Sequence, residues 1–371
     1  MNKVISNVID FPNDSETVRF TACFVSMLMR AQGIVNDEQD FYCNGQNGFC
    51  IRCGKCEDFV PIKRLHSEIY NLYTIVTGYG FLQIDLSNDE HMNTAWEITS
   101  QVLLREFGDY VGFAMDFAGY EFEEVQTPES KASIFEKIKQ SIDKDIPVLM
   151  QLAHQYQWVL ITGYDDETET ILGLDGSSGY WGKSQANPIG YENGLFILPD
   201  WYEKLAHAYI LGNKKAPVYD IFDVLKRGKI IMKSMHEKEY YKNSLEYIRN
   251  SANFGNLNDE QLLKMRSRIA GWIGQPIDMR AMVGSAMNPI KNNELFNRKE
   301  AVALHKIHGL CWTIHDVLWI AWNALGQYKG GNKLDWAKGL QNEVIRNSVA
   351  DCADFLCNHD ERILESIEEV F

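Results

Sequence analysis

Two stretches of this sequence hold residue types that could act together as a nucleophile, a base and an orienting acid. Cys23 lies in an apolar helical pattern that polar residues precede, and His154 and Asp175 flank a predicted β-hairpin whose turn contains Gly163. A thiolate attacks best when its pKa is lowered, and a helix start beside an imidazole lowers it. The pattern therefore predicts that Cys23 opens a helix and acts as the nucleophile, with its own backbone N–H facing the developing oxyanion.

The assignment of the base leaves two interpretations open. Gln157 begins the first strand of the predicted hairpin, and His154 comes three residues earlier. In the first interpretation a bulge brings His154 to the thiolate, because an imidazole has a suitable pKa. In the second the base is missing and the fold binds without reacting. We adopt the first, in which Asp175 orients the imidazole and Gln157 positions the substrate. Taken alone, Cys23 is more simply a buried helix cysteine and Asp175 a turn residue.

These motifs resemble those of the papain-like C39 cysteine peptidases over roughly the first 200 residues. The matching segments are Ala22-Cys23-Phe24, Asp145-Ile-Pro-Val-Leu149, Trp158-Val-Leu-Ile-Thr-Gly-Tyr-Asp165 and Leu174-Asp175. They are most similar to the N-terminal domain of the butirosin biosynthesis H-type acyltransferases, and the size and layout also resemble the cysteine-protease-like amide synthase of closthioamide biosynthesis. The resemblance implies a papain-like fold that transfers an acyl group from a carrier-protein thioester to an amine. Gln157 stands where the pattern has its histidine.

Two further groups of residues have the spacing of metal ligands. Cys43, Cys50, Cys53 and Cys56 lie close together, and four thiolates could hold a structural zinc ion, with an iron–sulfur cluster or plain thiols as alternatives. We expect this segment to be a structural appendage, and we expect no cofactor for catalysis. His308, Cys311 and His315 share one helical face, but the tryptophans around them favour a packed helix with satisfied histidines.

The chain as a whole predicts an α+β papain-like domain over residues 1–215 and an all-helical domain over residues 216–371. Strand patterns fall near 110–116, 146–152, 157–163, 169–174, 194–199 and 206–211. After residue 218 only helical patterns remain, with a helix start at Asn258 and breaks at 274–276 and 288–293. Gly33 is the expected stop of the first helix. The N-terminus lacks the apolar core of a signal peptide, so we expect a soluble cytoplasmic protein.

The function expected from these residues is formation of an amide through a Cys23 acyl-enzyme in natural-product biosynthesis. The donor would be an acyl or peptidyl carrier protein with its phosphopantetheine thioester, and the acceptor a small amine or diamine. Trp158 and Trp181 would wall the acyl channel. The net charge of −15 would attract a cationic amine and disfavours nucleic acid and anionic membranes. A homodimer is one allowed assembly. The alternatives are a C39-like peptidase or amidase with the same site and a catalytically inactive binding protein.

Overall fold

The computed structural model describes residues 2–11, 18–35, 64–89, 96–153, 157–175, 190–192, 195–291, 294, 296–326 and 332–371. Over these residues the chain is a mixed α+β protein, with helices and one antiparallel sheet. It forms two compact units, which are both discontinuous in sequence: residues 1–73 with 114–218, and residues 74–113 with 219–371. That residues 1–215 and 216–371 are separate domains stays a prediction, and residues 74–113 group with the C-terminal helices.

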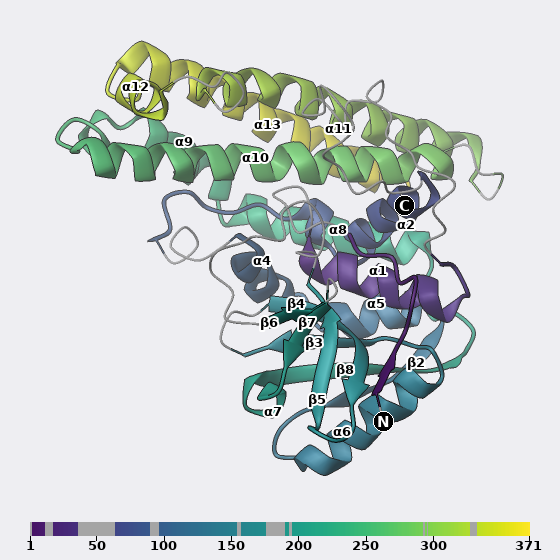
Figure 1. The fold of residues 1–371 in the computed structure, drawn as a ribbon. Helices are drawn as coiled ribbons and strands as arrows, with labels where there is room; N and C mark the ends of the chain where they lie inside the picture. Colours follow the sequence, from purple (N-terminus) through teal and green to yellow (C-terminus); the bar gives the residue numbers. More distant parts are fainter. Residues whose placement is uncertain are drawn as a thin grey trace. The chain divides into compact units, whose positions relative to one another are not determined.

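The first unit is built on the antiparallel sheet, which is drawn in Figure 1. Its strands are β1 (Asn2–Val4), β2 (Tyr120–Val125), β3 (Val148–Leu152), β4 (Gln157–Asp165), β5 (Thr170–Leu174), β6 (Gly190–Glu192), β7 (Leu195–Leu198) and β8 (Leu205–Lys214). The strand order is β2-β8-β3-β4-β5-β7-β6, and β1 pairs with β4 off this path. The predicted hairpin of β4 and β5 is confirmed, and at its turn the Asp165 carboxylate accepts a hydrogen bond from the Glu167 N–H at 2.9 Å.

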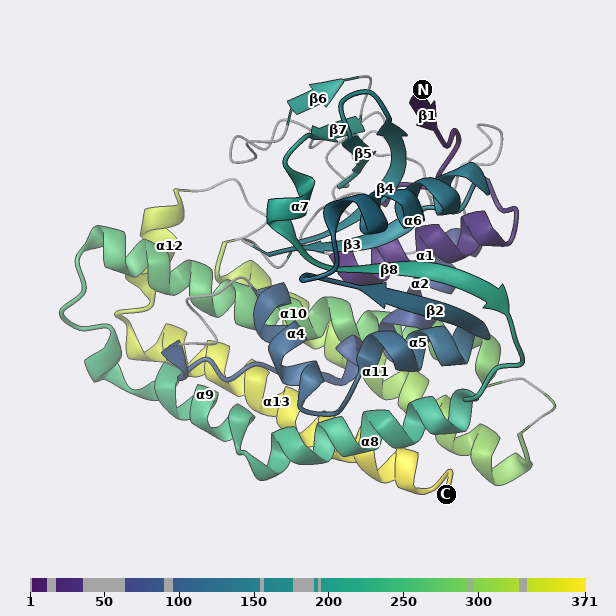
Figure 2. The same ribbon diagram turned by 90° about the horizontal axis from the view of Figure 1, so that it is seen from below.

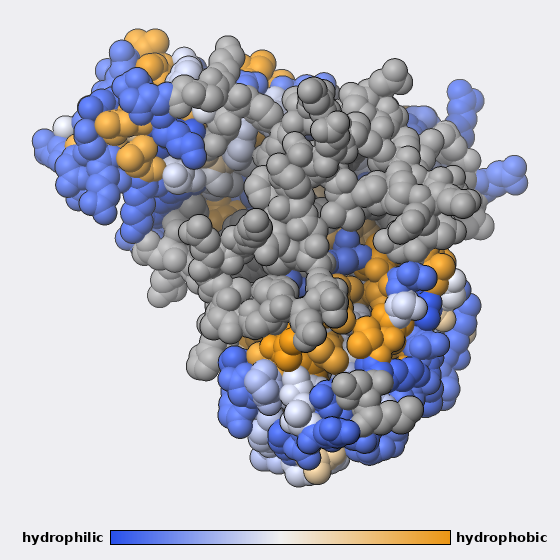
Figure 3. Space-filling model, in the orientation of Figure 1, coloured by the Kyte–Doolittle hydropathy of each residue, from blue (hydrophilic) through white to orange (hydrophobic). Residues whose placement is uncertain are grey.

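The two faces of this sheet pack against different helices. From α6 (Lys131–Asp143), Ile134 and Ile138 join a buried apolar cluster with Val159 and Ile161 of β4. Side chains alternate along a strand, so Trp158 lies on the opposite face, where its ring meets Phe20 of α1 (Arg19–Ala31). The outer side of α6 is polar, and hydrophilic residues predominate at the lower end of the view in Figure 3. The short helix α7 (Trp201–Lys204) precedes β8.

Helix α1 begins earlier than its sequence pattern suggests. The prediction that Cys23 opens the helix is wrong, because α1 begins at Arg19, and the N–H of Val18 before it donates to the Tyr70 hydroxyl at 2.7 Å. Burial of Arg19 and Phe20 against the rest of the unit makes this extra turn favourable. The predicted stop is confirmed: Gly33 has a φ of 75°, and Ile34 N–H donates to Met29 O at 2.9 Å.

The second unit consists of helices in the part of the chain that the structure describes. They are the 3₁₀ helices η2 (Tyr79–Phe81) and η3 (Ser251–Asn253), with α4 (Trp96–Arg105), α8 (Ile221–Glu237), α9 (Tyr240–Arg249), α10 (Asp259–Ile290), α11 (Arg298–Ala324), α12 (Lys333–Gly339) and α13 (Glu343–Glu368). The boundaries between the units fall inside α2 (Arg64–Val76) and α5 (Tyr110–Ala118). Helices α10, α11 and α13 pack along one another, as Figures 1 and 2 both show.

Three sequence expectations for the helices can now be compared with the structure. The helix start at Asn258 is confirmed, since Asn258 and Gln261 form a capping box. The predicted break at 274–276 is wrong, because α10 continues through Pro276. The predicted strand at 110–116 is also wrong: α5 occupies it, and the Asp109 carboxylate caps its start by accepting from the N–H groups of Val111 and Gly112. Among the described helices, none combines the length and the apolar character that crossing a membrane requires.

Candidate functional site

The candidate nucleophile, Cys23, lies inside α1 rather than at its end. Its thiol is buried, with 1% of the residue exposed, and it is the fifth residue of the helix. Only the first four N–H groups of a helix lack an intrahelical acceptor, and Ala22 N–H already donates to Val18 O at 2.9 Å. The expectation that the Cys23 N–H faces an oxyanion is therefore wrong. Any hydrogen bonds to such an oxyanion must come from side chains or from another segment.

Arg19 connects the start of α1 to the end of β5. The guanidinium is nearly fully buried and donates to Phe11 O at 2.9 Å and to Leu174 O at 3.2 Å. It also lies 3.4 Å from the Asp10 carboxylate. Leu174 immediately precedes Asp175, and Arg19 is one helical turn before Cys23. This one side chain therefore brings the helix that carries Cys23 to the end of the strand that leads to Asp175.

Asp175, the predicted orienting acid, is buried as well. It is 1% exposed, and it directly follows β5. A buried carboxylate is uncommon unless it interacts with other polar groups. Asp175 is therefore not an ordinary turn residue that faces solvent. The structure thus places both a thiol and a carboxyl group in the interior of the first unit, on elements that Arg19 holds together.

Gln157 and Trp158 begin β4 and lie on opposite faces of the sheet. Gln157 pairs with Leu152, and it falls on the face of Val159 and the α6 cluster. Trp158 falls on the α1 face, with its ring centre 4.9 Å from that of Phe20 in an edge-on arrangement. It is 1% exposed. The substrate-binding roles of both residues stay predictions, but only Trp158 shares a face with α1.

Several buried hydrogen-bond groups of α1 and of β4 have no partner within the described part of the chain. Among them are the hydroxyl of Thr21 and the indole N–H of Trp158. Thr21 precedes Cys23 by two residues, and Trp158 contacts Phe20, which is the neighbour of Thr21. A buried tryptophan usually finds an acceptor for its N–H, and leaving such a group unpaired costs about 1–3 kcal/mol. A ligand carbonyl is one kind of acceptor that would satisfy such a donor.

Close to these groups, aromatic side chains line α1. Phe24 stacks on Phe20 and lies 5.2 Å, centre to centre, from the ring of Tyr73. Burial, followed by the charge of Tyr120, raises the pKa of Tyr73 well above its usual value, so this hydroxyl stays neutral near pH 7. The environment of α1 is therefore apolar around its few polar groups, which strengthens any electrostatic interaction among them.

Several predicted site residues lie outside the described residues. They are His154, Trp181, Cys43, Cys50, Cys53 and Cys56. His154 belongs by sequence to the segment that joins β3 to β4. Within the described ranges there is no group of three or more His, Cys, Asp or Glu side chains that could hold a metal ion.

The helix histidines are satisfied by packing partners, as the sequence indicates. A ring nitrogen of His308 hydrogen-bonds to Gly284 O at 2.7 Å, and Trp319 donates to His315 at 2.8 Å. Cys311 between them is fully buried, and burial raises the pKa of its thiol to about 12. This face of α11 is a packed helix surface.

Arg19 is the residue of this site that the sequence analysis missed. The available signal was a charged residue inside an apolar helical pattern, Val18-Arg19-Phe20. Its partners, however, include backbone carbonyl oxygens, and one of them is 155 residues away. No side-chain pattern identifies such acceptors.

Comparisons with protein-family models, curated proteins and solved structures found no match for this chain. The class that the described residues define is accordingly an α+β protein with a buried thiol and a buried carboxyl group on elements that a buried arginine connects.

Proposed function

We propose that the chain is a papain-like cysteine acyltransferase that forms an amide from an acyl thioester and a small amine. The observation that carries the proposal is the burial of the Cys23 thiol and the Asp175 carboxyl group on elements that Arg19 connects, and the unpartnered indole N–H of Trp158 is one donor on the α1 face of the sheet. A site prepared for a developing oxyanion needs preorganised donors in a dry environment. The Arg19 connection between α1 and the end of β5 supports the pairing of Cys23 with Asp175 through an imidazole.

The proposed reaction has two steps. The Cys23 thiolate attacks the thioester carbonyl carbon, a carbon–sulfur bond to Cys23 forms, and the bond to the carrier sulfur breaks. The carrier thiolate takes up the proton that the Cys23 thiol gave to the base. The amine nitrogen then attacks the acyl-enzyme, the amide bond forms, and the Cys23 sulfur leaves. The amine proton passes to His154 in this proposal, and Asp175 stabilises the imidazolium.

The test is the mass of the intact protein after incubation with a simple acyl thioester, such as an N-acetylcysteamine ester. We expect one acyl adduct, its loss in Cys23→Ala, and its release as amide when a small amine is added. Losing the nucleophile should reduce turnover by several orders of magnitude, because removing the nucleophile of a well-studied catalytic triad lowers kcat by about 10⁶-fold. Cys352→Ala, at a half-buried cysteine in the second unit, is the matched control and should still form the adduct.

Partitioning between amide and free acid distinguishes the transferase from the peptidase or amidase alternative. With millimolar amine present, we expect amide to dominate, because the apolar surroundings of α1 limit access of water. Free acid as the main product with every amine tried, together with cleavage of ordinary peptides, would favour the hydrolase.

A second candidate is a binding protein without catalysis. One observation favours it: Cys23 is the fifth residue of α1, so the free N–H groups of the helix start do not surround its thiol. If Cys23 reacts with iodoacetamide no faster than an unactivated thiol near pH 7, this candidate replaces the transferase.

A further inference from the structure

An imidazole and a carboxylate form a hydrogen-bonded pair on the sheet of the first unit. His207 of β8 lies beside Glu124 of β2, and its Nδ1 is 2.6 Å from a carboxylate oxygen. Because an ionised carboxylate can only accept, Nδ1 carries the hydrogen of the neutral imidazole and Nε2 keeps its lone pair. The Tyr209 hydroxyl donates to the same oxygen at 3.3 Å, which holds the carboxylate in place. The pair thus presents Nε2 as a base that a carboxylate supports.

This His207–Glu124 pair lies on the face of the sheet that α1 covers. His207 is opposite Gln151 of β3, and Gln151 is opposite Trp158 of β4, so the three residues form one row across neighbouring strands (Figure 2). Residues that are directly opposite in an antiparallel sheet point to the same face. Strands are about 4.8 Å apart, which puts the backbone of His207 about 10 Å from that of Trp158. Since the Trp158 ring meets Phe20, the pair belongs to the end of the sheet where α1 begins.

The Tyr209 ring bridges the pair and Trp158. Its centre is 6.3 Å from that of His207 and 5.9 Å from that of Trp158. The His207 and Glu124 side chains are 28% and 36% exposed, whereas Cys23 is 1% exposed. A carboxylate beside aromatic rings attracts a cation, both by its charge and through the ring faces. A small cationic amine that arrives from solvent can therefore contact the pair, while the thiol itself is enclosed.

An amine that becomes an amide must lose two protons. A small alkylamine is protonated near pH 7, as the lysine side chain is, and an ammonium ion has no lone pair with which to attack a carbonyl carbon. One proton must therefore leave before the attack on the acyl-enzyme, and a second leaves as the amide forms. In the reaction proposed for Cys23, His154 takes the second proton. The first proton needs another acceptor.

We propose that His207 accepts the first proton, with Glu124 as its positioning residue. This inference rests on the function proposed above and adds the residue that prepares the amine. An N–H bond of the alkylammonium ion breaks, its electron pair stays on the nitrogen, and the proton binds Nε2 of His207. Glu124 stabilises the imidazolium that results, and the partly exposed ring then releases the proton to water. The substrate class is accordingly a small primary alkylamine, which is cationic before this step and neutral after it.

The experiment follows the full chain by intact mass, first during acylation with the N-acetylcysteamine thioester and then during release to an added amine. His207→Gln should form the adduct as fast as the wild type, because acylation does not involve the amine. Release to ethylamine at pH 7 should be about 10²–10⁴-fold slower in this variant. Release to methoxyamine, which is already neutral at this pH, should stay within about tenfold of the wild type. Glu124→Gln should also slow release to ethylamine, but by less than His207→Gln, because the imidazole remains.

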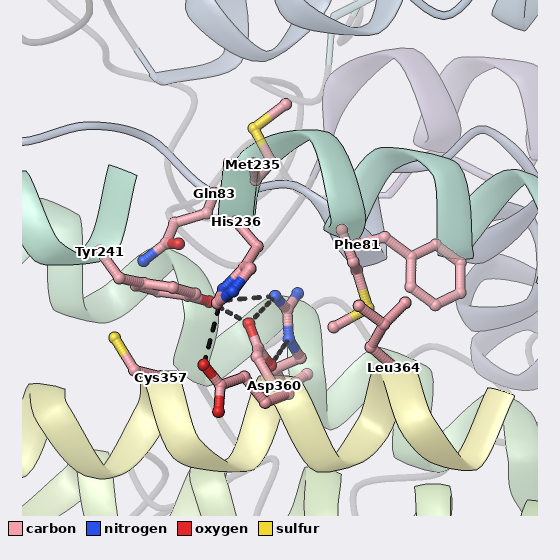
Figure 4. Close-up of a pocket in the computed structure, with 11 residues that line it drawn as sticks. Phe81, Gln83, Met235, His236, Tyr241, Cys357, Asp360 and Leu364 are labelled. Atoms are coloured by element: carbon pink, nitrogen blue, oxygen red, sulfur yellow. Dashed lines mark hydrogen bonds and ion pairs between the residues drawn. The ribbon is translucent and has the colours of Figure 1, made fainter. Parts of the chain in front are cut away.

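The matched control is His236→Gln, at a histidine–carboxylate pair of the second unit. Figure 4 shows His236 on α8, and its Nδ1 is 3.7 Å from the carboxylate of Glu361 on α13. Both side chains are exposed, and this variant should release the adduct to both amines at wild-type rates.

Three results would overturn the role of His207 and leave the acyl-enzyme standing. They are equal release to ethylamine in the wild type and His207→Gln, equal slowing of release to both amines, and slower formation of the adduct in the variant. Absence of the adduct from the wild type would instead reject the function proposed for Cys23, and the role of His207 with it.

Discussion

At the scale of the residue, Arg19 is a buried polar side chain that holds the start of α1 and the end of β5 together, although the sequence analysis did not single it out. A buried guanidinium is tolerated only where acceptors surround it, and here they are Phe11 O, Leu174 O and the Asp10 carboxylate. The nearby segment around Asp10 and the end of β5, which is 155 residues away in the sequence, thus meet at one side chain of α1. The candidate site on α1 depends on this contact because it joins the start of α1 to the end of β5.

We predict that Arg19→Met lowers the free energy of unfolding by about 2–4 kcal/mol, because it removes the buried guanidinium that donates to Phe11 O and Leu174 O and pairs with Asp10. Urea denaturation of the full chain measures this. Lys131→Met is the control: the Lys131–Glu169 pair is 2.8 Å apart but exposed, so its loss should change stability by less than about 1 kcal/mol. Equal effects of the two substitutions would show that Arg19 is not the connecting residue.

We predict that the protein loses stability as the pH falls below the usual histidine range. Burial, the largest cause in each case, lowers the pKa of His308 and of His359 below 6.5. A group with a lowered folded-state pKa contributes its full stability above the unfolded-state pKa, and this is lost as the pH falls through the folded-state value. Melting temperatures between pH 7.5 and pH 5 should therefore fall less in the double variant His308→Gln/His359→Gln than in the wild type. An equal fall of the melting temperature in both proteins would show that His308 and His359 do not cause the loss of stability.

At the scale of the element, two glycines in α10 have opposite surroundings. A Cβ on Gly274 would lie 2.5 Å from the Trp322 ring, whereas a Cβ on Gly271 would have nothing within 4 Å. Gly274 is therefore required for the close approach of α10 and α11, while Gly271 only weakens the helix. The two positions are three residues apart on the same helix, so a substitution at Gly271 is a control for the same substitution at Gly274.

We predict that Gly271→Ala raises the free energy of unfolding by about 0.5–1 kcal/mol, through better helix propensity. Gly274→Ala should lower it by about 1–3 kcal/mol, because the indole must move. Thermal or urea unfolding of both variants measures the difference. If Gly274→Ala were the more stable of the two, the packing of α10 on α11 would differ from that described.

The same elements show what could be predicted from sequence. Helix starts with side-chain caps, such as Asn258, and hairpin strands with alternating or apolar runs were predicted because their signals are local. The failures have tertiary causes. Pro276 is accommodated inside α10 although a helix-interior proline costs about 3 kcal/mol, since it is buried in a long packed helix. For the site, Cys23 and Asp175 were recognisable by type and order, but the carbonyl contacts of Arg19 were not.

At the scale of the whole molecule, the C-terminal helices satisfy the backbone of a segment near the middle of the first half. The Trp272 N–H donates to Ile84 O at 2.8 Å, Ser244 accepts from Leu86 N–H at 2.8 Å, and Arg268 donates to Leu86 O at 2.8 Å. Residues 74–113 therefore belong to the second unit, although the sequence composition changes only near residue 215. A cut at residue 215 would separate these groups from their partners.

We predict that a fragment of residues 1–215 does not fold cooperatively alone, because the polar backbone groups of residues 84–86 and their apolar neighbours lose their packing partners. Near-UV circular dichroism and hydrogen exchange measure this. Co-expression with residues 216–371 should restore protection of the segment. A fragment with native-like protection on its own would show that the second unit is not needed for residues 74–113.

The interleaving of the two units also determines the order in which the chain can mature during synthesis. A ribosome releases residues 74–113 long before residues 219–371 exist, so their apolar side chains stay without a native partner while the first unit assembles around residues 114–218. This interval is the period in which a chaperone would be most useful. Slower translation beyond residue 218 would prolong that exposure and increase aggregation.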